Sequence, residues 1–517
     1  MRILIVLVLF FFPYLLSAQV YPKREMRAAW IATVTNVDWP STPDLSVEKQ
    51  QKEMVRMLDE LKSYNLNTVV FQVRPASDAF YASPYEPWSQ WLTGKQGRGP
   101  VPFYDPLDFV IKECRKRGME IHVWFNPYRA VFGAGRTTTD PQHISNKHPE
   151  WFLSYGKNKY FDPGLPQTRE YVTRIICDVV RRYDIDAVHL DDYFYPYKIP
   201  HVEFPDDNSF AQYPRGFSKE DKAAWRRDNV NLIIKQLHDS IKSIKPLVQF
   251  GVSPFGVWRN NYQDQNGSNT KAGTTNYDDL YADILKWQKN GWVDYVTPQL
   301  YWPIGKKIAD YAVLSDWWSK NANGCQVFIG QAPYRIEKKA KEKAWKSSQE
   351  LVRQINLNRS LPNIQGSMYF SAKYFLKNPL QMKQNLTSSV YRYPALPPEI
   401  NPAKPIIPSL PANAVMKIEN NQLKFTWNKN TNDKTYVLYC FKKNETPDFS
   451  DPSSIVAFTA ETEYVLSLDK KHDPAEYNYI LTALSPSNAE SLPVNFEQKK
   501  AEERLITNIQ EPSKTVR

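Results

Sequence analysis

A β pattern followed by an α pattern recurs eight times between residue 27 and about residue 390, and this regularity constrains the fold most strongly. The strand candidates are short and rich in β-branched or aromatic residues, whereas the segments between them carry apolar residues at helical spacing. The strands are expected at 27–34, 68–74, 120–126, 186–192, 248–253, 294–301, 326–331 and 366–371. The helices are expected at about 47–64, 107–117, 167–183, 218–244, 277–290, 308–321, 344–356 and 379–389.

Eight such units predict an α/β fold of the (β/α)8 or TIM-barrel type, with an open doubly wound sheet as the alternative. The connections that follow the strands are long, at 75–105, 127–166, 193–217 and 254–276, and those that follow the helices are short. In TIM barrels the active site lies at the carboxyl ends of the strands, in the loops that follow them. The asymmetry therefore predicts a functional site on that face.

The alternation of residues along each strand predicts which side chains point into the barrel. Apolar residues such as Val188 and Leu190 are expected to face the helices, so His189 and Asp191 face the barrel axis. A purely structural interior would consist of Val, Ile and Leu. The other strands instead give a mostly polar and aromatic inner set: Gln72, Arg74, His122, Trp124, Asn126, Gln249, Gly251, Ser253, Thr297, Gln299 and Tyr301. These residues favour a polar cavity lined by aromatic rings.

Residues 1–18 have the pattern of a secretory signal peptide, with an uncleaved anchor as the alternative. Arg2 supplies the positive start, an apolar stretch covers 3–16, and the small residue Ala18 offers a cleavage site. No later segment approaches 18 apolar residues, so no stable membrane insertion is expected. The mature protein is therefore predicted to be exported to the periplasm or the cell exterior.

The chain beyond the barrel, which is expected to occupy 19–392, changes in character. Residues 393–411 are rich in proline and suit a stiff linker. Short β runs over 412–497, with an early Trp427 and a Tyr-x-Tyr that begins at Tyr477, resemble a fibronectin type III sandwich. The charged tail at 498–517 is expected to be flexible. The predicted architecture is thus a TIM barrel followed by a small all-β sandwich.

Aromatic residues make up 14% of the chain, which suits either a large core or a cleft that binds sugar rings. The net charge of +11 permits attraction to an acidic cell-wall polymer. No nucleic-acid-reading motif is present, so no nucleic-acid partner is expected. Free buried thiols are expected, with one disulfide as the alternative, because the four cysteines lie far apart and form no CxxC pair: Cys114, Cys177, Cys325 and Cys440.

The inner surface carries one carboxylate at a strand end, Asp191, with Asp192 beside it. Carboxylates among rings and amides suit glycoside hydrolysis, in which one protonates the leaving oxygen and another attacks or stabilises the sugar centre or activates water. A helix cap or a salt bridge to Arg129 is the structural alternative. Neighbouring residues diverge on a strand, so the partner carboxylate is expected from a loop. Asp78 is preferred among the candidates, which also include Glu203, Asp206, Asp207 and Asp38.

Two other functions compete with glycoside hydrolysis. His122, His189 and Asp191 lie on neighbouring strands and suit a metal-dependent hydrolase or deacetylase, although no HxH or HExxH spacing supports a metal site. A non-catalytic carbohydrate-binding barrel is the other alternative, because the second carboxylate is not evident. No GxSxG elbow or phosphate-binding loop occurs. We therefore expect neither a metal nor another cofactor.

Several motifs follow one another through the barrel: REMRAAW at 24–30, NVDWP at 36–40, FQVRPASDAFY at 71–81, WFNPYR at 124–129, HLDDYFYP at 189–196, GVSPFGVWR at 251–259 and PQLYW at 298–302. With these motifs the chain resembles the glycosyl hydrolase family 10-like (DUF187) group of secreted bacterial barrel proteins. The resemblance implies a hydrolase of glycosidic bonds and a role for Asp191 and Asp192 in its cleft. Some members of the group resemble enzymes that cut the glycan strands of peptidoglycan.

The strand-end Glu pair of true family 10 xylanases is missing, since strand four ends in Asp191 and strand seven in Gln331. Xylan is therefore not the expected substrate. We predict a secreted glycoside hydrolase of a polysaccharide, with a cell-wall glycan favoured and Asp191, Asp192 and Asp78 as catalytic residues. The sugar, the linkage, the stereochemical course and the oligomeric state stay open. The predicted substrate-binding residues are Arg74, Trp124, Asn126, Tyr128, Arg129, His189, Tyr193, Tyr195, Trp258, Gln299, Tyr301 and Trp302.

Overall fold

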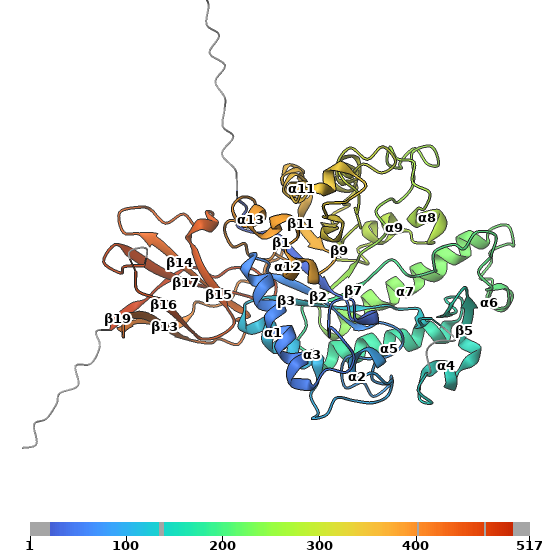
Figure 1. Ribbon diagram of the computed structural model, residues 1–517, viewed down its shortest axis with the longest axis horizontal. Helices are drawn as coiled ribbons and strands as arrows, with labels where there is room; N and C mark the ends of the chain where they lie inside the picture. The colour runs from blue at the N-terminus through green and yellow to red at the C-terminus, as the bar shows by residue number, and fades with distance from the viewer. Residues whose placement is uncertain (1–20, 134–138, 401–402, 470–471, 500–517) are drawn as a thin grey trace, which may run out of the picture.

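The predicted barrel is confirmed by the computed structural model, which describes residues 21–133, 139–400, 403–469 and 472–499. Eight parallel strands close into a barrel in which β11 pairs with β1 (Figure 1). The strands are β1 Met26–Ile31, β2 Thr68–Arg74, β3 Glu120–Phe125, β7 Ala187–Leu190, β8 Gln249–Val252, β9 Tyr295–Val296, β10 Gln326–Gln331 and β11 Ile364–Tyr369. The predicted signal peptide at 1–18 and residues 500–517 of the predicted tail lie outside the described residues, and residues 498 and 499 of that tail belong to strand β19, Glu497–Lys499.

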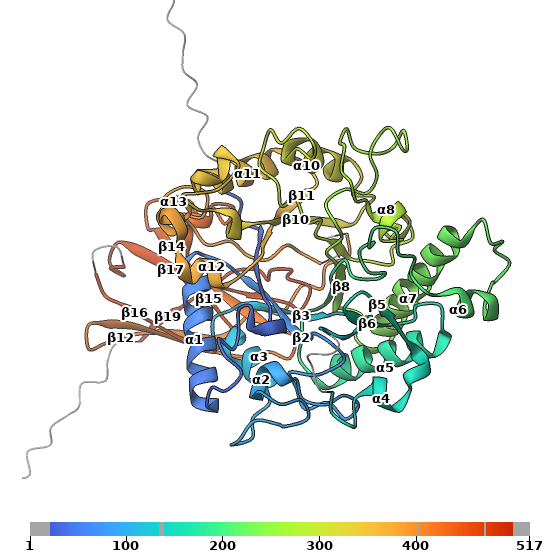
Figure 2. The same cartoon turned by 45° about the vertical axis from the view of Figure 1, so that its right-hand side comes forward.

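Helices surround the barrel (Figure 2). Some of these helices begin at a residue whose side-chain oxygen accepts a hydrogen bond from a free backbone N–H group of the first turn. Ser46 accepts from the Lys49 N–H at α1, and Asp105 accepts from the Leu107 and Asp108 N–H groups at α3. In the described part of the chain, none of the helices has the length and apolar character of a membrane span. The helices are α1 Val47–Ser63, α2 Gln90–Thr93, α3 Pro106–Lys116, α4 Ile144–Lys147, α5 Pro166–Arg182, α6 Asp207–Gln212, α7 Lys222–Ile244, α8 Asn276–Asp279, α9 Ile284–Lys289, α10 Tyr311–Lys320, α11 Gln349–Ser360, α12 Lys373–Lys377 and α13 Met382–Thr387.

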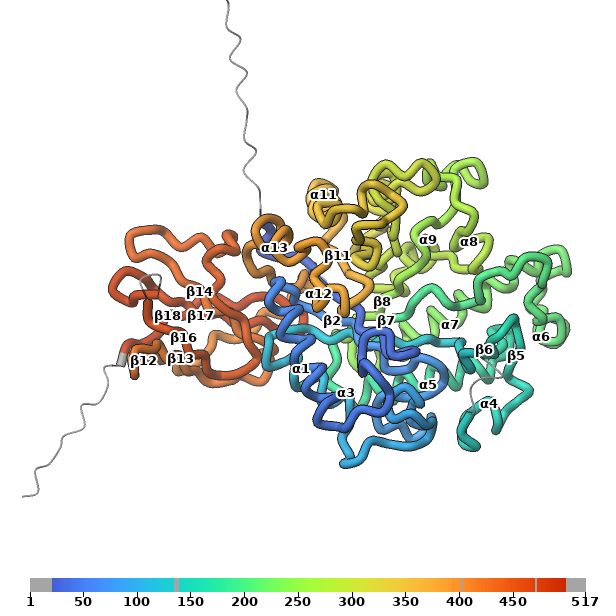
Figure 3. The backbone as a smooth tube through the Cα atoms, in the orientation of Figure 1, coloured from blue at the N-terminus to red at the C-terminus, as the bar shows by residue number. Residues whose placement is uncertain are grey.

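The long connection after β3 forms a small sheet of its own. Its strands β4 Arg129–Val131, β5 Phe152–Tyr155 and β6 Asn158–Phe161 pair in the order β4-β6-β5. Together with α4 and α6, strands β5 and β6 lie at the end of the molecule opposite the C-terminal sheets (Figure 3). The sheet brings Arg129 back towards the mouth of the barrel.

The two faces of each barrel strand meet different surroundings, as the alternation predicted. Val69 and Phe71 belong to the apolar layer between barrel and helices. Trp124 and Tyr295 belong to a separate cluster inside the barrel. Gly251 leaves room for this cluster, because a Cβ atom there would lie 2.0 Å from the Tyr295 ring.

The C-terminal residues form a small all-β domain of two four-stranded sheets, in the orders β16-β13-β12-β19 and β15-β14-β17-β18. Its core contains Phe425, Trp427 and Tyr479. The domain lies beside the barrel in Figure 1. The strands are β12 Ala412–Glu419, β13 Gln422–Asn428, β14 Thr435–Lys442, β15 Ile455–Thr459, β16 Glu463–Ser467, β17 Tyr477–Leu484, β18 Val494–Asn495 and β19 Glu497–Lys499.

A buried lysine joins this domain to the barrel. Lys434 Nζ lies 2.5 Å from Glu120 Oε1 and 2.8 Å from Asp186 Oδ1. Asp186 also pairs with Arg115 at 2.7 Å, and Asn488 donates a hydrogen bond to Glu120 at 2.9 Å. Glu120 begins β3 and Asp186 directly precedes β7. The C-terminal domain therefore covers the amino-terminal end of the barrel and leaves the carboxyl ends of the strands uncovered.

Residues 393–400 of the proline-rich segment contact both domains. Leu396 is fully buried, donates its N–H to the Lys23 carbonyl at 2.8 Å and accepts from the Glu25 N–H at 2.9 Å. Ile400 donates to the Ser487 carbonyl of the C-terminal domain at 2.9 Å. These backbone bonds fix the path of the chain from one domain to the other.

All four cysteines are free thiols, as expected. Cys114 and Cys177 are buried, and Cys325 and Cys440 are half-buried. Burial raises the pKa of the Cys114 thiol to about 12. Because the thiolate is the reactive form, these side chains are structural groups rather than nucleophiles.

Candidate active site

A cavity of about 190 Å³ lies at the carboxyl ends of the barrel strands. Asp191 follows β7, Ser253 follows β8 and Phe370 follows β11, so the ends of several strands contribute to it. This volume is below the roughly 300–1,000 Å³ of sites for drug-sized ligands, so it suits a single ring-sized group. The lining residues are Trp30, Ala32, Val34, Val37, Gln72, Trp124, Arg129, Asp191, Asp192, Tyr193, Ser253, Gln299, Tyr301 and Phe370.

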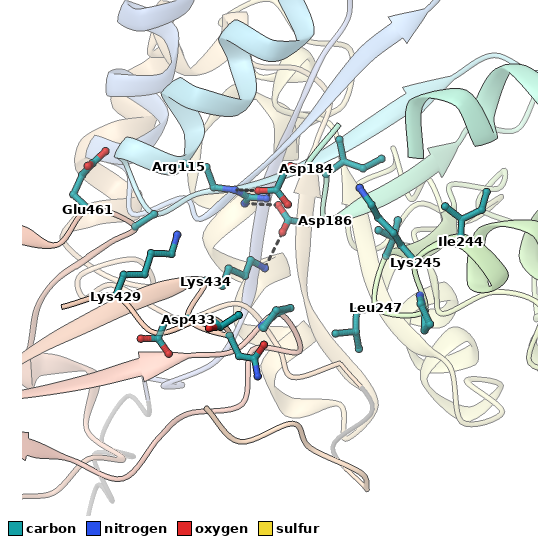
Figure 4. A pocket seen from close by; sticks show the side chains of 17 residues that line it. Arg115, Asp184, Asp186, Ile244, Lys245, Leu247, Lys429, Asp433, Lys434 and Glu461 are labelled. Atoms are coloured by element: carbon teal, nitrogen blue, oxygen red, sulfur yellow. Dashed lines mark hydrogen bonds and ion pairs between the residues drawn. The ribbon is translucent and has the colours of Figure 1, made fainter. Parts of the chain in front are cut away.

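A larger cavity of about 620 Å³ lies at the other end of the barrel, between its amino-terminal loops and the C-terminal sheets. Figure 4 shows Arg115 and Lys434 directed at Asp186 from two sides. These charges satisfy one another and hold the two domains together. We therefore regard this cavity as a junction between domains and the smaller one as the candidate active site.

Asp191 and Asp192 both line the smaller cavity although they are neighbours in the chain. Strand β7 ends at Leu190, so the alternation of strand side chains does not apply to these two residues. The predicted strand at 186–192 extended too far, so the divergence of the two side chains that we inferred from it does not follow. Both residues are almost fully buried, with 4% and 3% of their surface exposed.

A chain of side-chain amides holds Asp191. Gln72 Oε1 accepts the backbone N–H groups of Thr33 and Val34, each at 2.9 Å. Gln72 Nε2 donates to Asn126 Oδ1 at 2.6 Å, and Asn126 Nδ2 donates to Asp191. The turn that follows β1 is thereby linked to the orientation of the carboxyl group. Asn126 and Gln72, which we predicted to point inward, act here as positioning residues.

The electrostatics of the pair suit proton transfer. Burial raises the pKa of Asp191 to about 7, and the adjacent Asp192 carboxyl adds to this effect against the opposing charge of Arg129. Burial also raises the pKa of Asp192, whereas the hydroxyl of Tyr197, which donates a hydrogen bond to it, lowers that pKa. Two nearby carboxyls cannot both ionise freely, so the pair retains a proton near neutral pH. A general acid beside a carboxylate is what glycoside hydrolysis requires.

Five aromatic rings line the cavity. Trp124, Tyr193 and Tyr301 were predicted as substrate-binding residues, and Gln299 also lies there as predicted. Sequence reasoning missed two of the rings, Trp30 and Phe370, although the signals were present. The alternation along β1 turns Trp30 inward, and Phe370 directly follows β11.

Arg74 does not line the cavity, although we predicted that it binds substrate. Its Nε and Nη2 atoms donate to Glu86 at 2.7 and 2.6 Å. Nη1 donates to the carbonyls of Asn126 and Pro127, and Nη2 also donates to Ser77. All five N–H groups of the guanidinium are thus used within the protein. Arg74 fixes the loops after β2 and β3 and has no donor left for a substrate.

Asp78, our preferred partner carboxylate, is fully buried behind the cavity and does not line it. It accepts hydrogen bonds from the Ala76 N–H and from Gln96, each at 3.2 Å. Burial raises its pKa to about 7, against the hydrogen bonds from Ser89 and Gln96. Asp78 therefore holds the loop after β2 together.

The other candidate carboxylates are also engaged elsewhere. Asp38 accepts a hydrogen bond from Ser371 at 2.6 Å, and Asp206 pairs with Arg226 at 2.8 Å. The last two are exposed members of surface ion pairs: Glu203 and Asp207. Among the described residues only Asp191 and Asp192 present carboxylates to the cavity. The sequence at 134–138 contains no Asp or Glu.

The two barrel histidines lie below the cavity floor. His189 Nδ1 and His122 Nδ1 each lie 2.9 Å from the Tyr295 hydroxyl. Trp30 donates to His189 Nε2 at 3.2 Å, and burial lowers the pKa of His189 well below its usual value. The described residues contain no group of three side chains arranged to hold a metal ion. The proposed ligand set of His122, His189 and Asp191 is thus not brought together.

Four further residues predicted to bind substrate lie outside the cavity. Tyr128 is fully buried, and the Tyr195 hydroxyl accepts a hydrogen bond from a helix side chain. Trp258 stacks on Trp317 with ring centres 5.9 Å apart. Trp302 packs edge-on against a neighbouring ring. These rings stabilise the loops around the site.

The closed barrel, with a buried carboxyl pair among aromatic rings at the carboxyl ends of its strands, defines a TIM-barrel protein with a glycosidase-like site. The chain belongs to the family described as Glycosyl hydrolase-like 10, whose model matches residues 25–347.

Two curated relatives align with most of the chain. The protein is 44% identical over 493 residues to Glycosyl hydrolase YngK of Bacillus subtilis (strain 168), covering 93% of this chain and 94% of that protein. It is 38% identical over 377 residues to Glycosyl hydrolase DigH of Escherichia coli (strain K12), covering 69% of this chain and 84% of that protein. The solved PgaB (BpsB) glycoside hydrolase domain from Bordetella bronchiseptica is 11% identical, with a TM-score of 0.46, over 71% of this chain and 99% of that domain.

Proposed function

We propose that the protein is an exported glycoside hydrolase that cleaves glycosidic bonds of a polysaccharide, with the glycan strands of peptidoglycan as the favoured substrate. The observation that carries the proposal is the carboxyl pair of Asp191 and Asp192 within a cavity lined by aromatic rings. Membership in a glycosyl hydrolase-like family and relatives described as glycosyl hydrolases support it. The apolar segment at 3–16 supports export.

In this proposal Asp191 and Asp192 act as one catalytic unit. One carboxyl of the pair gives its proton to the leaving oxygen, and the other, as a carboxylate, stabilises the oxocarbenium-like centre or orients a water molecule. Asn126 orients Asp191, and the Tyr197 hydroxyl favours the ionised form of Asp192. The flat faces of Trp124 and the other lining rings hold the sugar.

Release of new reducing ends from purified peptidoglycan sacculi and from plant polysaccharides tests turnover. Asp191→Asn and Asp192→Asn should each lower kcat by about 10²- to 10⁴-fold, the usual contribution of general acid–base catalysis. Asp316→Asn is a matched control, because Asp316 pairs with Lys320 on the surface of α10. Unchanged turnover in both active-site variants would refute the assignment.

The second candidate function is glycan binding without catalysis. One observation favours it: no third carboxylate of the described residues lines the cavity. Binding of a glycan, measured by calorimetry, with no new reducing ends from any substrate would establish this function instead. Loss of turnover in the presence of a chelator would instead support metal-dependent hydrolysis.

A further inference from the structure

Arg129 differs from every other buried arginine of the described residues. Its guanidinium lines the cavity, yet it forms no hydrogen bond and no ion pair with any of them. The other three buried arginines each have a carboxylate at 2.6–2.8 Å: Arg27 with Glu25, Arg74 with Glu86 and Arg226 with Asp206. The fold thus supplies a partner for buried guanidinium groups except at the candidate active site.

The position of Arg129 is well defined by its surroundings. It begins β4 and pairs with Tyr160 of β6, and its carbonyl accepts a hydrogen bond from Ser77 at 3.2 Å. The guanidinium carbon lies 4.5 Å from the centre of the Tyr193 ring and 5.5 Å from that of Phe132. Stacking on rings orients a guanidinium and leaves its N–H edge free to bind a ligand.

The N–H groups of Arg129 are available to a ligand in the cavity, although its charge also acts on Asp191 and Asp192. Only 7% of the Arg129 surface is exposed, and a guanidinium carries five N–H donors and does not lose its charge in proteins. None of its nitrogens is among the fully buried side-chain atoms without a hydrogen-bond partner, so these donors reach the cavity, where a ligand can approach them. A ligand with two acceptor oxygens in one plane would satisfy them, and a carboxylate matches the fork of the guanidinium best.

We propose that Arg129 binds a carboxylate carried by the sugar in this cavity, so that the substrate is an acidic glycan. This inference rests on the proposed function and names the substrate class of the same site. The net charge of +11 also attracts a polyanionic strand. A sugar-borne carboxylate has two common sources, the lactyl ether group of muramic acid in peptidoglycan strands and the C6 carboxylate of a polyuronate.

The test compares each glycan with its neutral form. Peptide-free peptidoglycan strands and polygalacturonate oligomers are used as they are and after reduction of their carboxylates to primary alcohols. The enzyme is wild type, Arg129→Gln, Arg129→Lys or, as a control, Arg56→Gln on the exposed face of α1. For each pair, kcat/KM is measured by release of reducing ends, and Kd is measured by calorimetry.

Wild type and Arg56→Gln should prefer the acidic form of one glycan by about 30-fold, which corresponds to about 2 kcal/mol. Arg129→Gln should lose this preference, and Arg129→Lys should keep part of it. Because Arg129 also lowers the pKa values of Asp191 and Asp192, its loss affects every substrate. The ratio between the acidic and the neutral form isolates its contact with the carboxylate.

A wild-type ratio near one, or a ratio that Arg129→Gln leaves unchanged, overturns the proposal. Preference for either acidic glycan supports it and identifies the source of the carboxylate. If no glycan is hydrolysed, the binding ratios still test Arg129, and the absence of turnover refutes only the proposed function.

Discussion

Replacing Lys434 by Met should lower the free energy of unfolding by about 3–5 kcal/mol, the usual result of breaking a buried ion pair. The Lys434 side chain is 9% exposed and contacts both Glu120, at 2.5 Å, and Asp186, at 2.8 Å. Methionine fills a similar volume but brings no charge. Asp186 would keep Arg115, whereas Glu120 would have no lysine or arginine partner and would stay buried at the barrel end.

The size of this effect should depend on pH in a defined direction. Although burial acts to raise it, Lys434 lowers the pKa of Glu120 to about 2, below the value of about 4.3 for an unfolded chain. A carboxyl with a depressed folded pKa contributes stability that is present above the unfolded pKa and is lost as the pH falls through the folded pKa. The difference between wild type and variant should therefore be full at pH 7 and should shrink below about pH 4.3.

Urea unfolding followed by circular dichroism, at pH 7 and at pH 3.5, measures both effects. Lys424→Met is the matched control, because Lys424 pairs with Glu463 at 3.3 Å on the exposed surface of the same domain and should contribute at most about 1 kcal/mol. Adding Glu120→Gln to Lys434→Met should recover part of the loss, since the side chain left behind is neutral. A loss below about 1 kcal/mol at pH 7, or a double variant no more stable than the single one, contradicts the reasoning.

Three further predictions concern the site and the thiols. Tyr197→Phe removes the hydrogen bond that lowers the pKa of Asp192, so the acidic limb of the profile of kcat/KM against pH should move up by about one to two pH units; an unmoved limb would show that Asp192 does not titrate in catalysis. Arg74→Met should lower the urea-derived unfolding free energy by about 3–5 kcal/mol because Glu86 is left unpaired, with an unchanged KM in the folded enzyme; a raised KM would restore its predicted binding role. Dithiothreitol should leave the melting temperature unchanged, and Cys114 should not react with a thiol dye in the folded protein.

The fold was accessible from the sequence because its signals are local. Eight alternations of strand and helix patterns lie in order along the chain, and the inward positions follow from a period of two residues. Gln72, Trp124 and Gln299 reach the cavity as this periodicity predicts. The same rule could have found Trp30, which we missed although it lies on the inner face of β1.

The site was less accessible because it depends on contacts between distant residues. Arg74 ends a barrel strand and Arg129 follows one, and the two look alike in sequence. Glu86 folds back onto Arg74 and forms an ion pair with it, whereas Arg129 stacks on the Tyr193 ring and acts on Asp191 and Asp192 through its charge. Asp191 and Asp192 both line the cavity just beyond the end of β7 at Leu190, and strand ends are the part of a fold that a sequence predicts least reliably.

The contact of Lys434 between the two domains affects how the C-terminal domain can be lost or exchanged during evolution. Glu120 and Asp186 belong to the barrel, and the cation that neutralises them is supplied from a position more than two hundred residues later in the chain. A descendant that lost the C-terminal domain would inherit a barrel in which Glu120 has lost both Lys434 and Asn488 and meets water instead. Exchange of the domain by recombination would require a lysine or arginine at the same place. Loss or exchange of the C-terminal domain is therefore expected to be accompanied by a change at Glu120 or by a new cation beside it.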